Sequence, residues 1–99
     1  MDEELKKFVE DVRKAFKDAE ILLFGSRATG TARPDSDYDL IIVSKKFKGI
    51  PYVNRAYEVL IKTNAKIATD VLCYTPDEIK PISKKSIILK NALQHTVSL

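Results

Sequence analysis

Residues 21–43 read ILLFGSRATGTARPDSDYDLIIV and carry the clearest structural signals of the chain. Residues 21–24 and 40–43 are short, continuous apolar runs, which predict two buried strands. Gly25 ends the first run. The polar residues 26–35 include Gly30 and Pro34 and predict a loop or a short helix followed by a turn. We therefore expect two strands of one small sheet, joined by a polar connection.

Helical and strand patterns alternate around this stretch. The first segment, residues 5–16, has apolar side chains at the i, i+3, i+4, i+7 spacing of a helix, and residues 67–74 form a third apolar run that predicts a strand. The alternation continues to the end of the chain and has the order αβαβαβα. It indicates one α/β domain over residues 1–99, with a small sheet covered by helices.

Three further elements are predicted in the second half. A helix over 52–62 places several apolar side chains on one face, namely Val53, Ala56, Tyr57, Leu60 and Ile61. Thr75 and Glu78 have the spacing of a capping box, with Pro76 at the first helical position. A last helix is expected over 83–95, followed by a short strand over 96–99.

Composition excludes several classes of protein. Leu, Ile, Val and Phe make up 30 of the 99 residues, too many for a disordered chain. No apolar run reaches 18 residues and the start is acidic, so we expect neither a membrane span nor a secretory signal. The single cysteine, Cys73, and the single histidine, His95, leave no disulfide framework and little for a zinc centre. We expect a cytoplasmic protein.

The charge is distributed unevenly. Residues 1–44 contain seven basic and ten acidic residues, a net charge of −3, whereas residues 45–99 contain ten basic and four acidic residues, a net charge of +6. A basic half suits anionic ligands or partners. Because the lysines are scattered rather than clustered, we expect no direct binding of nucleic acid.

Gly25 and Ser26 predict a phosphate site. A glycine at the end of a strand lets another group approach the backbone closely. Ser26 then opens a turn or helix, whose free N–H groups bind anions such as phosphate. Gly25 and Gly30 have the spacing of a P-loop, but Thr31 and Ala32 follow where that motif requires Lys and Ser or Thr, so the P-loop is excluded.

Three carboxylates predict a divalent cation. Asp37 and Asp39 occupy alternate positions at the start of a strand, so their side chains point to one face and Tyr38 to the other. Two such charges repel unless they share a proton or hold a cation, and Mg²⁺ binds carboxylates together with substrate phosphates. Asp70, inside the third apolar run, could complete the site. A turn or cap role for the pair, and an exposed edge-strand role for Asp70, stay open from the residues alone.

These residues resemble a known family. Gly25-Ser26, ten residues, then Asp37-x-Asp39 is similar to the GS-x(10)-D-x-D signature of the polymerase-β-like nucleotidyltransferases. The surrounding sequence resembles the minimal, single-domain MNT antitoxins over nearly the whole chain, including Asp70. Thr29 departs from the pattern, because many such sequences carry Arg there.

The resemblance implies a fold and an activity. The fold would be that of the polymerase-β-like nucleotidyltransferases, a small mixed β-sheet with helices packed on it. The activity would be transfer of AMP from ATP with release of pyrophosphate. Asp37 and Asp39 would bind two Mg²⁺ ions, and Asp70 would bind the catalytic metal nearest the attacking hydroxyl. Gly25 and Ser26 would hold the β- and γ-phosphates.

The resemblance also implies a partner. Family members of this size pair with an HEPN-type toxin, a helical ribonuclease, and silence it by adding AMP to a toxin tyrosine, by direct binding, or by both. Two functions therefore stay open from the sequence: a Mg-dependent protein adenylyltransferase that neutralises its toxin, and a non-catalytic antitoxin that masks the toxin in a complex. The three intact aspartates favour the enzyme.

Overall fold

The structure is a computed structural model that describes residues 3–30, 37–64, 67 and 69–99. Within these residues, one sheet contains β1 (Glu20–Phe24), β2 (Tyr38–Val43), β3 (Thr69–Tyr74) and β4 (Val97–Ser98), in the order β3-β2-β1-β4. β1 is antiparallel to both β2 and β4, whereas β2 and β3 are parallel. The sheet is therefore mixed, as the resemblance implies.

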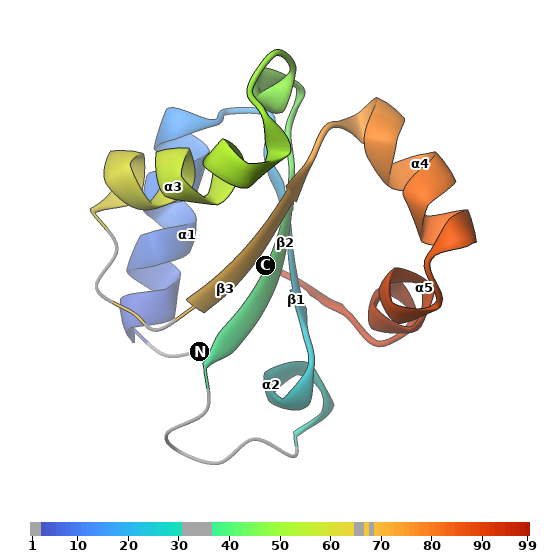
Figure 1. Ribbon diagram of the computed structural model, residues 1–99. Coiled ribbons are helices and arrows are strands. Elements are labelled where there is room, and N and C mark those ends of the chain that lie inside the picture. The colour runs from blue at the N-terminus through green and yellow to red at the C-terminus, as the bar shows by residue number, and fades with distance from the viewer. Residues whose placement is uncertain (1–2, 31–36, 65–66, 68) are drawn as a thin grey trace.

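Helices cover both faces of the sheet (Figure 1). α1 (Glu3–Ala15) and α3 (Tyr52–Thr63) lie on one face, and α4 (Pro76–Lys85) and α5 (Ile87–Gln94) lie on the other. Two short elements connect the strands: α2 (Ser26–Thr29) follows β1, and the 3₁₀ turn η1 (Lys45–Phe47) follows β2. The predicted α/β class with a small helix-covered sheet is confirmed.

The central strand β2 separates two apolar clusters. Its residues Tyr38, Leu40 and Ile42 belong to the larger cluster, which contains the buried stripe of α1. Its residues Ile41 and Val43 belong to the smaller cluster beneath α4 and α5. This alternation is the period of a strand with both faces covered. The predicted stripe of the first helix is confirmed as core by the burial of Leu5, Phe8, Val9, Val12 and Phe16.

The helix predicted over 52–62 is confirmed as α3, but the predicted apolar face does not pack on the sheet. The buried side chains of α3 are Arg55, Val59 and Thr63. Thr63 can be buried because its hydroxyl donates to the Val59 carbonyl at 2.7 Å, which satisfies the polar group inside the helix. Periodicity alone selected the wrong face, since the polar groups of the true inner face are satisfied by tertiary contacts.

The last helix predicted over 83–95 is wrong in its bounds. α4 begins at Pro76 behind the predicted capping box, which is present, and ends at Lys85. Ser86 is extended, with φ −95° and ψ 117°, and separates α4 from α5. It serves both helices, because its N–H donates to the Ile82 carbonyl and its own carbonyl accepts from the Lys90 N–H. The third strand also begins later than predicted, at Thr69, whereas the predicted final strand is confirmed as β4.

The guanidinium of Arg55 joins four segments. It is 6% exposed and donates to the Ile50 carbonyl before α3 and the Cys73 carbonyl in β3, at 2.9 and 3.3 Å. It also makes a bidentate pair with Glu78 in α4, at 2.5 and 3.1 Å. A paired and hydrogen-bonded arginine can be buried in this way without a large desolvation cost. The position and rotation of α3 follow from this network.

Replacing Glu78 by Gln tests how much the Arg55–Glu78 pair contributes to the free energy of unfolding. Arg55, with help from the Thr75 N–H, lowers the pKa of Glu78 to about 2 from its ordinary 4.5. We expect Glu78→Gln to lower the free energy of unfolding at pH 7 by about 2 kcal/mol, a moderate loss because Glu78 is partly exposed. A lowered carboxyl pKa stabilises the fold above pH 4.5, so the difference from the native chain should shrink as pH falls from 4.5 toward 2.

Urea denaturation at several pH values measures both the loss of stability in Glu78→Gln and its dependence on pH. Glu58→Gln is the matched control, since the Glu58 carboxylate pairs with Lys62 on the exposed side of α3 at 3.8 Å. That change should cost less than about 0.5 kcal/mol. Equal losses for the two variants would contradict a structural role for the Arg55–Glu78 pair.

Candidate active site

Parallel pairing of β2 and β3 brings two of the predicted carboxylates together. Asp39 lies directly opposite Asp70 in the register. Neighbouring strands are about 4.8 Å apart, and residues at matched positions of a parallel pair project to the same face. That face is the one beneath α4 and α5, because Tyr38 and Leu40 on either side of Asp39 enter the opposite core. The two strands begin at the end of the sheet where β1 passes into α2 (Figure 1).

Gly25 lies against the Asp39 carboxylate. Phe24 is paired with Asp39, so Gly25 is the first residue beyond the β1–β2 ladder. A Cβ atom at Gly25 would lie 2.4 Å from Asp39 Oδ2, and the backbone there has φ +74°. The positive φ favours glycine at this position, and any larger residue would also displace the Asp39 carboxylate. The group that approaches Gly25 closely is the Asp39 carboxylate, and the binding of phosphate at Gly25 stays a prediction.

Asp37 adds a third charge at the edge of the site. It lies just before β2, which starts at Tyr38, and its side chain is exposed. Burial raises the pKa of Asp39, and the carboxylates of Asp70 and then Asp37 raise it further. The carboxylates of Asp70 and Asp37 thus both act on Asp39 electrostatically. The result is a concentration of negative charge at one end of the sheet.

Other predicted site residues are placed less completely. Ser26 begins α2, but its side chain lies outside the described residues, as does the predicted turn at Pro34. The Arg27 guanidinium lies 4.5 Å from the centre of the Tyr38 ring, a cation–π contact. Tyr38 is buried, as predicted from its side chain pointing to the other face of β2 from that of Asp39. Arg27 therefore packs on the core side of β2.

Cys73 takes no part in this site. Its side chain is 2% exposed, and burial raises the pKa of its thiol to about 12. The thiol therefore stays protonated at neutral pH and is a poor nucleophile. Cys73 instead belongs to the larger core cluster.

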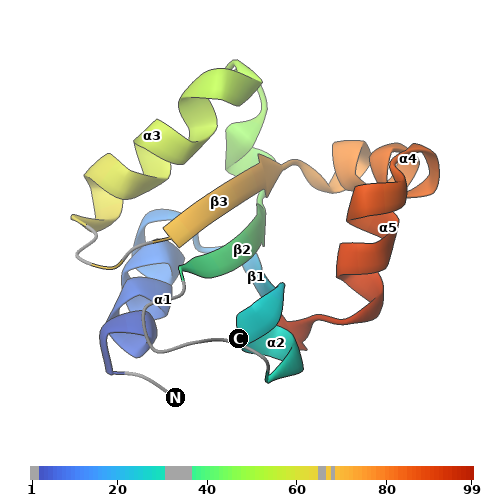
Figure 2. The ribbon, with the colours of Figure 1, turned by 60° about the horizontal axis from the view of Figure 1, so that its bottom comes forward.

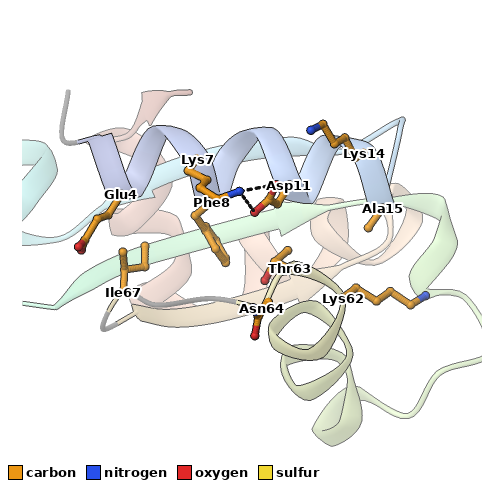
Figure 3. Close-up of a pocket in the computed structure, with 10 residues that line it drawn as sticks. All are labelled: Glu4, Lys7, Phe8, Asp11, Lys14, Ala15, Lys62, Thr63, Asn64 and Ile67. Carbon is orange, nitrogen blue, oxygen red and sulfur yellow. Dashed lines mark hydrogen bonds and ion pairs between the residues drawn. The ribbon is translucent and has the colours of Figure 1, made fainter.

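A pocket of about 560 Å³ lies elsewhere, between α1 and the end of α3 (Figure 3). Phe8, Ala15 and Ile67 form its apolar lining, and Lys7 at its rim is paired with Asp11 at 3.2 Å. The three predicted carboxylates are absent from its lining. The pocket therefore has no part in the candidate site predicted from the carboxylates.

The carboxylates fit a hard divalent cation but are not gathered around a single point. Across residues 3–30, 37–64, 67 and 69–99, no group of three or more His, Cys, Asp or Glu side chains is arranged to hold a metal ion. The donor set nevertheless consists of carboxylate oxygens, which Mg²⁺ prefers. Gly25 lies against one of them, and burial, followed by the charges of Asp70 and Asp37, raises the pKa of Asp39, so a bound cation would favour its ionised form.

Comparison with known proteins identifies the family. Residues 5–95 match the family model of the nucleotidyltransferase domain. The chain therefore belongs to this family, and the resemblance noted from the sequence is confirmed. A search of curated proteins finds no significant match.

Solved structures agree with the fold. A candidate nucleotidyltransferase is 26% identical, with a TM-score of 0.62 and 96% of each chain covered. A candidate nucleotidyltransferase from Sulfolobus solfataricus is 24% identical, with a TM-score of 0.67, 96% of this chain and 75% of that chain covered. A toxin–antitoxin structure with AMP-PNP is 18% identical, with a TM-score of 0.58, 97% of this chain and 71% of that chain covered. The last two show the fold alone.

None of the helices in the described part of the chain has the length and apolar character needed to cross a bilayer.

The contact between Gly25 and Asp39 can be tested by stability. Gly25→Ala should lower the free energy of unfolding by about 3 kcal/mol, because the added Cβ meets the carboxylate in a strained backbone conformation. Gly49→Ala is the matched control, since Gly49 has φ +85° and open space around it. That variant should lose only about 1 kcal/mol of backbone strain. In an Asp39→Ala background the cost of Gly25→Ala should fall toward the control value, and an unchanged cost would contradict the contact.

Burial of the Asp39 carboxylate and its repulsion by Asp70 and Asp37 predict a variant more stable than the native chain. Asp39→Asn should raise the free energy of unfolding at pH 7, without metal, by roughly 0.5–1 kcal/mol, the scale of a like-charge cross-strand pair. A raised carboxyl pKa destabilises the fold when the group is ionised, so the gain should vanish as pH falls below 3.8. Asp11→Asn, which breaks a surface pair with Lys7, should instead be neutral or slightly destabilising. A native chain that matches Asp39→Asn at pH 7 would refute the repulsion.

Proposed function

We propose that this nucleotidyltransferase-family chain transfers AMP from Mg-ATP to a hydroxyl group of a protein partner. The observation that carries the proposal is the register of β2 and β3, which sets Asp39 opposite Asp70 beside Gly25. Family membership supports nucleotidyl transfer as the reaction. Reactions of this type depend on positioning and charge neutralisation rather than on a protein nucleophile, which agrees with a site made of carboxylates and backbone.

The proposal gives each residue a role. Asp37 and Asp39 would hold two Mg²⁺ ions with the triphosphate, and Gly25 and Ser26 would bind the β- and γ-phosphates through the backbone and the Ser26 hydroxyl. Asp70 is exposed and lies on β3, the strand at one edge of the sheet, so an incoming hydroxyl can reach it. Bound Mg²⁺ supplies charge neutralisation and activation of an oxygen nucleophile. The chain itself orients the phosphates and places Asp70 next to the acceptor.

A protein acceptor is supported by the likeness of fold to a toxin–antitoxin structure with AMP-PNP. We propose an HEPN-type toxin as the partner and the cytoplasm as its location, both on the sequence resemblance. Masking of the toxin without catalysis is the competing function, and Asp70 separates the two. A mask has no need of a carboxylate beside Asp39.

The nucleotide site can be tested first. ATP should bind more tightly with Mg²⁺ than with a chelator, and Asp39→Asn should remove most of this difference. Isothermal titration calorimetry measures both. Asp77→Asn is the matched control, because Asp77 is exposed on α4 and is not one of the three candidate site carboxylates. Equal ATP affinity with and without Mg²⁺ would count against the site.

The transfer step can be tested with Asp70. Asp70→Asn should leave Mg-ATP binding nearly intact but slow transfer to the toxin about a hundredfold to several thousandfold, a loss of roughly 3–5 kcal/mol of transition-state stabilisation. Intact mass spectrometry of the HEPN-type toxin, incubated with the chain and Mg-ATP, would report an AMP-sized increment. If the native chain produces no increment yet neutralises the toxin without ATP, the masking function is correct.

A further inference from the structure

The exposed face of α3 carries an unusual concentration of apolar side chains. Of the seven large apolar residues that are exposed in the described part of the chain, five lie on this helix. Four form one stripe at the spacing of successive helical turns, with exposed fractions of 83% for Val53, 65% for Tyr57, 38% for Leu60 and 56% for Ile61. We call these four residues the α3 stripe. Scattered exposed apolar residues need no explanation, but a continuous stripe does.

The rotation of α3 that exposes the stripe is held by the inner face of the helix. Arg55 is tied to Glu78 and to two backbone carbonyls, and Val59 is fully buried. Turning the stripe inward would expel Arg55 from this network and leave its partners unsatisfied. The stripe is therefore exposed in the stable fold and must be covered from outside or remain in water.

We propose that the α3 stripe is the interface of a symmetric dimer of this chain. Val53, Tyr57 and Ile61 follow one another at intervals of four residues, about 12 Å from first to last. If the two α3 helices pack antiparallel about a two-fold axis at Tyr57, Val53 of one copy would contact Ile61 of the other. Tyr57 would contact Tyr57 of the other copy. An apolar stripe of this symmetry is complementary to itself, as a two-fold interface requires.

Charge permits two copies to meet on this face. The stripe contains no ionisable group other than the Tyr57 phenol, its neighbour Asn54 is neutral, and Glu58 is paired with Lys62 on the flank. The positive excess lies elsewhere, because residues 79–99 contain four Lys and no acidic residue. These residues form most of α4 and α5, which lie on the opposite side of the molecule from α3 (Figure 2). Two copies joined through α3 would keep their basic helices apart.

The exposed area of the α3 stripe determines how strongly we expect two copies to associate. Four side chains exposed to this degree offer roughly 500 Å² per copy, within the range of the largest patches on monomers. Two copies would then bury about 1,000 Å², the lower limit for a specific interface. The dimer should therefore be weak and reversible. The inference does not depend on the proposed transferase activity, since a variant of the stripe leaves all three carboxylates in place.

Sedimentation velocity of the full chain tests the proposal. The mass should rise from the 11.2 kDa of one chain toward twice that value between about 10 µM and 1 mM, where an interface of this size dissociates. Tyr57→Lys, and Val53→Lys as a second variant, should remain monomeric at every concentration with an unchanged circular dichroism spectrum. Ile87→Lys is the matched control, because Ile87 is 77% exposed on α5, and it should behave as the native chain.

Disulfide trapping gives an independent readout. Cys73 is the single native cysteine and is buried, so an introduced thiol reports alone. With diamide as oxidant, Tyr57→Cys should form a linked dimer at least tenfold faster than Ile87→Cys. A native chain that is monomeric up to about 1 mM, a dimer that survives Tyr57→Lys, or equal trapping at the two positions would overturn the proposal. In the first case, any cover for the stripe would have to be a different protein.

Discussion

The register of the central strand is the constraint on which both the core and the candidate site depend. β2 is paired on both sides, antiparallel to β1 and parallel to β3, and its two faces enter different apolar clusters. A slip by one residue would turn Asp39 into the larger core and move Tyr38 to the site face. The apolar residues of β2 exclude that slip, because burying a carboxylate without a partner is costly. Packing of the core thus fixes the position of a catalytic candidate.

The site itself is an electrostatic compromise. Three carboxylates lie near one end of the sheet without converging on one point, and one of them, Asp39, lies against a glycine with a positive φ. Such an arrangement weakens the fold when no cation is bound. Regions that break the local rules of stability are common at functional sites, where a ligand restores the balance. Carboxylate oxygens are also the protein ligands that Mg²⁺ prefers.

Arg55 has an effect on the surface as well as on the interior. By holding Glu78, β3 and the segment before α3, it ties the two faces of the sheet together at the end opposite the carboxylates. It also settles which side of α3 is inside. An arginine in the core therefore accounts for an apolar stripe on the outside, which links the stability of the fold to a surface available for association.

Short-range patterns in the sequence were enough to predict the α/β class, most of the helices and strands and the residues of the candidate site. The apolar stripe of α1, the strand runs, the capping box at Thr75 and the glycine-serine and aspartate spacing all act over a few residues, so each is legible without the fold. Three features needed the tertiary structure. Asp39 and Asp70 are 31 positions apart and meet only through parallel pairing of their strands. The inner face of α3 depends on a bond between Arg55 and Glu78, and the break at Ser86 depends on hydrogen bonds to two different helices. Contacts between distant residues leave no periodic signal along the chain, and for that reason these three features could be decided only in the folded molecule.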